Sequence, residues 1–105
     1  MSKFYNIDGS TATTVELVSP SGANAIIKSV LLTNTHDTVT ATVSLFIQDD
    51  PISGTTSTYK LINKIYVPVG ASLLLDEPSI FRFGEKYGLY IQVASTTTID
   101  VIIST

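Results

Sequence analysis

The chain has 105 residues, of which 44% are hydrophobic and 14% charged, with a net charge of −3 and no cysteine. This length suits one domain, and the apolar fraction is enough for a core, which argues against wholesale disorder. The acidic balance argues against a protein that binds a phosphate backbone. The absence of cysteine excludes a disulfide framework and a thiolate zinc site. We therefore expect one domain over residues 1–105, stabilised by its core or by neighbouring subunits.

No targeting or membrane segment is visible in the sequence. The first nine residues, MSKFYNIDG, lack the apolar region of a secretory signal. No apolar run approaches the ~20 residues that cross a membrane as a helix. We therefore expect synthesis and folding in a cytoplasm.

Short runs rich in β-branched residues alternate with turn residues along the chain, a spacing that is typical of a sandwich or barrel. In chain order, strands are expected at residues 4–7, 13–18, 25–35, 39–48, 59–67, 72–75, 80–83, 87–95 and 97–104. Residues 48–58 form the longest expected loop. The last two strands are expected to form a hairpin around Ser95 and Thr96.

The run 39–48 has the clearest alternation, with hydrophobic residues at the odd positions and mainly polar residues at the even positions. Such a strand has one buried face and one wet face. The short connections cannot hold parallel crossovers, and an apolar sheet face must be covered by a second layer. The predicted fold is therefore all-β, an antiparallel two-sheet sandwich of jelly-roll or immunoglobulin-like topology.

No arrangement of nucleophile, base and orienting group is visible. The single histidine, His36, lies beside Asp37 in a polar turn, and no serine lies in a Gly-x-Ser-x-Gly elbow. We interpret His36 as a solvated turn residue. One histidine without cysteine cannot build a tetrahedral metal site within one chain.

Two acidic pairs, at residues 49–50 and 76–77, each precede a proline. Facing carboxylates are the apparatus of glycoside hydrolysis, and loop carboxylates also suit calcium. Both pairs match ordinary strand-ending turns better. We therefore predict no enzyme activity, no catalytic residue, no metal and no cofactor.

Five hydrophobic or aromatic residues fall outside the main apolar stripes of their strands: Phe46, Tyr66, Tyr90, Ile62 and Ile102. The three rings either lie under a loop or against the other sheet, or they contact another subunit or a sugar. The two isoleucines suggest strands covered on both faces, and in a small domain a partner chain often supplies such cover. These five residues are the predicted interface or ligand contacts.

Four stretches form a recurring scheme: AIIKSVLLTNT at 25–35, VTATVSLFIQD at 39–49, YKLINKIYVPVGASLLLD at 59–76 and YGLYIQVASTTTIDVIIS at 87–104. A strand ending in Thr-Asn-Thr is followed by one ending in Asp, one running into Pro-x-Gly, then Leu-Leu-Leu-Asp and two final strands. In this order the chain resembles small structural β-sandwich proteins of tailed bacteriophages, especially those that infect marine cyanobacteria.

The resemblance implies a non-enzymatic structural component of a phage virion, either a decoration, neck or tail-associated protein. Such a protein is made in the host cytoplasm, resides in the virion, and binds copies of itself and other virion proteins, without nucleic acid or membrane. The residues leave an alternative open, a carbohydrate-binding or host-recognition module that holds a glycan on its Thr- and Ser-rich loops and aromatic faces. A glycosidase that uses the acidic pairs is the third hypothesis.

Overall fold

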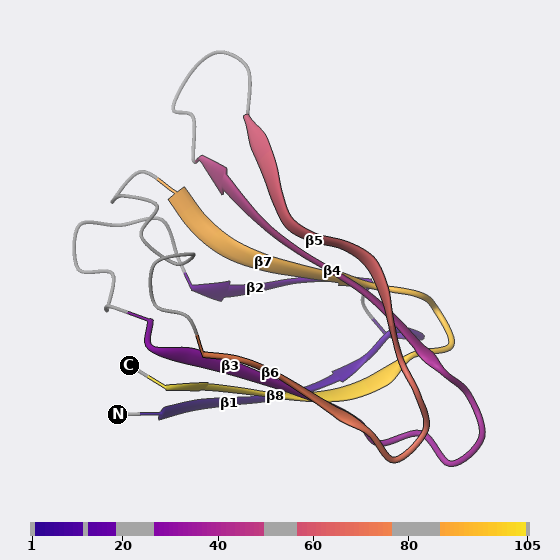
Figure 1. The fold of residues 1–105 in the computed structure, drawn as a ribbon. Helices are drawn as coiled ribbons and strands as arrows, with labels where there is room; N and C mark the ends of the chain where they lie inside the picture. The colour runs from indigo at the N-terminus through magenta and orange to yellow at the C-terminus, as the bar shows by residue number, and fades with distance from the viewer. Residues whose placement is uncertain (1, 12, 19–26, 50–56, 77–86, 105) are drawn as a thin grey trace.

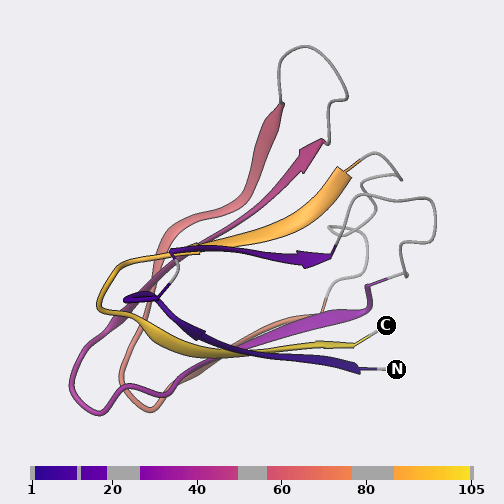
Figure 2. The same ribbon diagram turned by 180° about the vertical axis from the view of Figure 1, so that it is seen from behind.

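The computed structural model describes residues 2–11, 13–18, 27–49, 57–76 and 87–104, which form two four-stranded sheets packed face to face (Figure 1). The strands are β1 (Ser2–Asp8), β2 (Thr14–Val18), β3 (Ser29–Asn34), β4 (Ala41–Asp49), β5 (Thr58–Val67), β6 (Ser72–Leu75), β7 (Tyr87–Val93) and β8 (Thr98–Ser104). The first sheet has the order β1-β8-β3-β6 and the second sheet the order β2-β7-β4-β5. The sheets diverge toward the end that carries the two termini (Figure 2).

Every pair of neighbouring strands is antiparallel, so the predicted all-β, two-sheet sandwich is confirmed. Successive strands change sheet at every step except from β4 to β5. Eight strands interleaved in this way form a jelly roll. The strand order therefore selects the jelly roll over the immunoglobulin-like topology.

The predicted hairpin of the last two strands is wrong. A turn does connect them, closed by the Thr97 amide, which donates to the Ala94 carbonyl at 2.9 Å. Yet β7 lies between β2 and β4 in the second sheet, and β8 lies between β1 and β3 in the first. Alternation shows which face of a strand is buried, but an arch between two sheets and a hairpin within one sheet have the same pattern. The strand expected at 80–83 lies outside the described residues.

The core fills the space between the sheets and consists of the inward-facing residues of both. Its buried members are Ile7, Leu17, Val18, Ile27, Val30, Leu32, Ala41, Val43, Leu45, Ile47, Val67, Leu89, Ile91, Val93, Ile99, Val101 and Ile103. Each fully buried Val, Leu or Ile side chain stabilises the fold by roughly 1.5–3 kcal/mol relative to exposure. This core holds the two outer sheet faces in fixed positions.

Two irregularities in β5 change the face on which its residues lie. The partners of Val43, Leu45 and Phe46 are Ile65, Ile62 and Lys60, so β5 carries an extra residue at each of two steps. These β-bulges place Ile62 opposite the inward-facing Leu45, and Ile62 packs against the core. The out-of-phase position of Ile62 is therefore explained by bulges within the chain, whereas the sequence suggested a strand covered on both faces.

One open side of the sandwich, between β1 and β2, is bridged by Tyr5. Its hydroxyl donates a hydrogen bond to the Leu17 carbonyl, which joins an edge strand of each sheet. Burial, and after it the Glu16 carboxylate, raises the pKa of Tyr5. Both causes favour the neutral phenol, which is the form that can donate this bond.

We expect Tyr5→Phe to lower the free energy of unfolding by about 1 kcal/mol, because one hydrogen bond between the sheets is lost. Since folding raises the pKa of Tyr5, its contribution is complete below the unfolded value and is lost as pH rises through the folded value, above about pH 10. Urea unfolding at pH 7 and at several higher pH values measures both effects. A Tyr5→Phe variant whose stability falls with alkaline pH as steeply as the parent protein would contradict this assignment.

Candidate functional site

Three surfaces of the sandwich are candidates for binding: the outer face of each sheet, and the open side between the edge strands β5 and β6. Their strand registers determine which side chains stand next to one another, since residues that face each other across neighbouring strands lie on the same side of a sheet. The surfaces differ in chemistry, and each contains at least one residue that the sequence predicted as a contact.

The outer face of the first sheet carries a line of hydrophobic side chains that crosses all four strands. Ile102 of β8 is paired with Phe4 of β1 and with Leu31 of β3, and Leu31 is paired with Leu74 of β6. Phe4 is 72% exposed and Leu74 54% exposed, while Ile102 and Leu31 are half-buried. We call these four residues the apolar row.

The polar groups that flank the apolar row are bonded to each other. Asn6 Nδ2 donates to Asp100 Oδ1 at 2.6 Å, and the hydroxyls of Thr33 and Ser72 share a hydrogen bond at 3.0 Å. These residues form the next line across the same four strands. The outer face therefore presents an apolar stripe beside a polar line whose side chains already have partners.

The outer face of the second sheet carries a different line, from Glu16 through Tyr90 and Phe46 to Lys60. Tyr90 donates to Glu16 Oε2 at 3.1 Å, and the Phe46 and Tyr90 rings stack with centroids 5.6 Å apart. Lys60 Nζ lies 5.3 Å from the Phe46 centroid, which is within cation–π range. Phe46 is only 8% exposed, so its ring presents little surface to a partner or a sugar.

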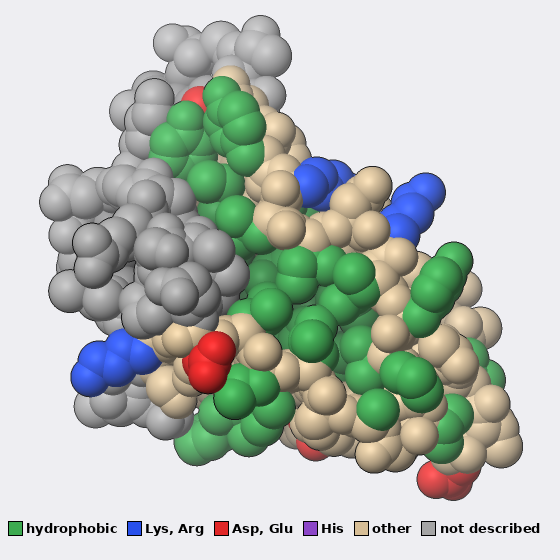
Figure 3. Space-filling view, viewed as in Figure 1, with side chains coloured by type: hydrophobic (Ala, Val, Ile, Leu, Met, Phe, Trp, Pro, Cys, Tyr) green, Lys and Arg blue, Asp and Glu red, His purple; other side chains and the backbone are tan. Residues whose placement is uncertain are grey.

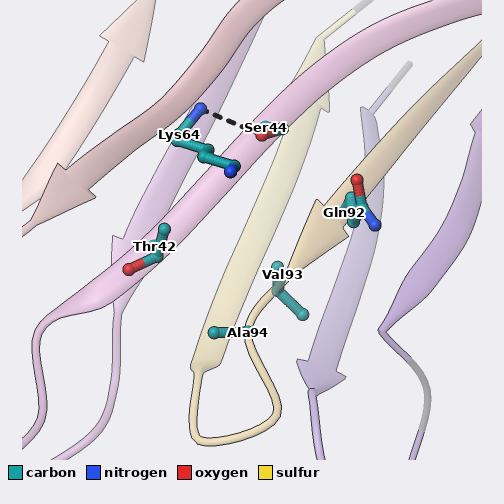
Figure 4. A pocket seen from close by; sticks show the side chains of 6 residues that line it. All are labelled: Thr42, Ser44, Lys64, Gln92, Val93 and Ala94. Atoms are coloured by element: carbon teal, nitrogen blue, oxygen red, sulfur yellow. Dashed lines mark hydrogen bonds between the residues drawn. The ribbon is translucent and has the colours of Figure 1, made fainter.

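A small hollow lies next to this line on the same face. Its polar lining comes from Thr42 and Ser44 of β4, from Lys64 of β5 and from Gln92 of β7, and Val93 and Ala94 complete the wall. Figure 4 shows these six residues around the hollow, which has a volume of about 210 Å³. One of the two β5 bulges lies opposite Ser44, between Ile62 and Ile65, and contains Lys64. This bulge moves β5 away from the regular register and leaves the hollow.

The open side between β5 and β6 is an apolar groove of about 460 Å³, and hydrophobic side chains gather there in Figure 3. Its lining includes Ile62, Ile65, Tyr66, Leu73 and Leu75. The two bulges of β5 and its cationic side chains interrupt this edge, which discourages the addition of another strand.

The structure distributes the five predicted contact residues over all three surfaces. Phe46 and Tyr90 are brought together as a stacked pair, whereas Ile62 and Tyr66 line the groove. Ile102 stands apart, at the centre of the apolar row.

Sequence reasoning missed the other members of the apolar row, namely Phe4, Leu31 and Leu74. Each stands next to an inward-facing hydrophobic residue, so in the sequence it reads as part of a short, fully buried apolar run. A signal was present, because an uninterrupted run such as Leu73–Leu74–Leu75 must place one side chain on the outer face of a strand. Only the register shows that these residues meet.

His36 has a structural role in its turn, because its Nδ1 accepts hydrogen bonds from the Thr38 and Val39 amides, both at 3.1 Å. Asp49 of the first acidic pair accepts from the Ser57 amide at 2.7 Å. Asp50 and Glu77 lie outside the described residues. Within the described ranges, no three His, Asp or Glu side chains gather as metal ligands, and no helix long and apolar enough to cross a membrane occurs.

The sequence matches no protein-family profile, no curated protein and no solved structure.

Proposed function

We propose that this protein is a non-enzymatic structural component of a phage virion, a decoration, neck or tail-associated protein that acts by self-assembly and by binding other particle proteins. The apolar row carries the proposal and is assigned as the contact surface. The resemblance of the sequence to small phage structural proteins supports it. The jelly roll supports it as well, because viral capsid proteins are among the proteins that use this architecture.

The apolar row has the position and shape of a protein contact. The outer face of a sandwich strand is normally polar, yet this row crosses the full width of the first sheet. Burial of exposed apolar surface contributes roughly 25 cal/mol per Å². Because the four strands are held by the core behind them, the backbone of the row is already ordered before it binds.

A second copy of the chain is the partner that this face fits. A two-fold axis through the row would bring Ile102 near its symmetry equivalent and the two stripes against each other, in a self-complementary contact. Such a contact brings few charges together. The flanking polar line contains one carboxylate, Asp100, which is bonded to Asn6, and Ser29 and Ser104 lie on the other side.

We expect the purified chain to form an oligomer that Phe4→Arg dissociates, because a desolvated guanidinium would replace an apolar contact. Loss of a large aromatic contact of this kind weakens association by about tenfold or more. Light scattering over a dilution series measures the mass. Tyr66→Arg is the matched control, since Tyr66 and Phe4 are both 72% exposed but lie on different sheets. If Tyr66→Arg dissociates the oligomer and Phe4→Arg does not, the contact lies at the β5–β6 side.

Incorporation into particles tests the virion assignment separately. Mass spectrometry of purified phage particles is expected to detect the chain in a fixed ratio to the major particle protein. Recombinant protein added to particles that lack it is expected to bind them, and Leu74→Arg is expected to reduce this binding. A chain that stays monomeric and never enters purified particles would contradict the proposed function.

A further inference from the structure

The hollow on the second sheet brings to one place several polar side chains that have no partner among the described residues. Elsewhere on this face, Gln48 donates to Thr58 at 3.2 Å and Lys60 lies over Phe46. No such contact is made by the Lys64 ammonium or the Gln92 amide within the described part of the chain. Several hydrogen-bond donors therefore face one small space.

Ser44 is the most informative of the lining residues, because it is 95% buried. Its Oγ accepts a hydrogen bond from the Lys64 amide at 2.9 Å. Its hydroxyl also lines the hollow, so it can donate to a group bound there while it accepts from Lys64. A buried hydroxyl gains free energy from a hydrogen-bond partner, which a ligand in the hollow would supply.

The backbone of Lys64 has an uncommon conformation. Its φ of 52° lies in the left-handed region, which costs a non-glycine residue on the order of 1–3 kcal/mol and is frequent at ligand sites. The bulge directs the Lys64 side chain to the hollow, and no carboxylate lies among the lining residues. The hollow is therefore suited to an anionic group.

The remaining lining indicates a ring with hydroxyl groups. Thr42, Ser44 and Gln92 can bond to hydroxyls, and Ala94 adds an apolar side chain to the lining. The volume of about 210 Å³ corresponds to about seven water molecules and is smaller than the sites of drug-sized ligands.

We propose that this hollow binds one acidic sugar unit, a hexuronate, of a glycan. Lys64 would bind the carboxylate, and Ser44, Thr42 and Gln92 would bind ring hydroxyls. This inference goes beyond the proposed function, because the hollow lies on the second sheet and the apolar row on the first. Assembly and sugar binding can therefore occur on the same molecule.

Titration of the isotope-labelled protein with glucuronate, glucose and acetate, followed by amide NMR, tests the proposal. Glucuronate is expected to shift the amide signals of Ser44, Lys64 and Gln92 in a saturable manner, and the other two probes much less. Equal binding of acetate would show a simple anion site, and equal binding of glucose would show that the acid is not recognised. Either result, or no shift with glucuronate, would overturn the proposal.

Two isosteric variants provide the controls. Gln92→Glu places a carboxylate in the hollow and is expected to weaken glucuronate binding by about tenfold or more, whereas Gln48→Glu makes the same change elsewhere on the face. Lys64→Gln is expected to have a similar effect, and Lys28→Gln none. Thermal unfolding of each variant confirms that it folds. Folded Gln92→Glu and Lys64→Gln proteins that bind glucuronate as the parent does would also overturn the proposal, while the oligomer mass reports separately on the proposed function.

Discussion

Gly9→Ala is expected to destabilise the protein by about 3 kcal/mol, at the upper end of the cost of overpacking. A Cβ at this position would lie 2.0 Å from the Ala94 carbonyl oxygen and 3.0 Å from its carbon. Both atoms are backbone, so no side-chain rotation relieves the clash. The Gly9 amide also donates to the Thr97 carbonyl at 2.8 Å, which holds the turn after β1 against the turn between β7 and β8. Urea unfolding measures the loss.

Gly70→Ala is the matched control for this prediction. Gly70 has a φ of 76° and no atom within 4 Å of a built Cβ, so its substitution meets backbone strain without a clash. The strain costs roughly 1–2 kcal/mol. If Gly70→Ala lost as much stability as Gly9→Ala, close packing of the two turns would not be the reason for glycine at position 9.

Asn34→Ala is expected to lower the free energy of unfolding by about 3 kcal/mol, because three hydrogen bonds worth roughly 1 kcal/mol each are lost. Asn34 is 3% exposed. Its Nδ2 donates to the Val39 and Val67 carbonyls, both at 2.9 Å, and its Oδ1 accepts from the His36 amide at 2.9 Å. The Asn34 side chain, from the first sheet, thus holds the end of β5, in the second sheet, by a hydrogen bond. Chemical denaturation measures the change.

Two further variants separate hydrogen bonding from volume. Asn34→Asp keeps the shape but directs a buried carboxylate at two carbonyl oxygens, so it is expected to be strongly destabilised at pH 7 and to regain stability when protonated in acid. Asn6→Ala removes an exposed asparagine that bonds to Asp100 and is expected to cost under about 1 kcal/mol. An Asn34→Asp protein as stable as the parent at pH 7 would refute the assignment of the donor bonds.

Strand positions could be predicted from the sequence because side-chain alternation reports directly on burial. The run 39–48 was expected to bury its odd positions, and Ala41, Val43 and Leu45 are fully buried. The expected strand at 72–75 matches β6, and most other boundaries differ by one or two residues. β3 begins at Ser29, and the expected start of this strand at residue 25 lies outside the described residues.

The pairing of strands could not be predicted in the same way. β7 and β8 have hairpin-like patterns but enter different sheets, because either arrangement buries Ile91 and Val101 equally well. The bulges of β5 were also hidden, since an extra residue leaves no mark in composition. In the sequence, Ile62 is out of phase with the alternation of its strand, but the bulges place it opposite the inward-facing Leu45.

The candidate surfaces were only partly visible in the sequence for the same reason. Ile102 was identified because it is out of phase in a well-alternating strand, and its outward position is confirmed by its pairing with Phe4 and Leu31. The hollow had no sequence signal, since Ser44, Lys64 and Gln92 come from three strands. Recognition of such a site requires the register.

The central place of β8 in the first sheet has a consequence for biosynthesis. Residues 98–104 lie between β1 and β3, so β1 has no strand to join until they leave the ribosome. The first sheet then closes by contacts between segments far apart in sequence, for which theory expects slow folding. Until that closure, the exposed edges of β1 and β3 are open to mispairing with other chains, and a chaperone would act most usefully at this stage.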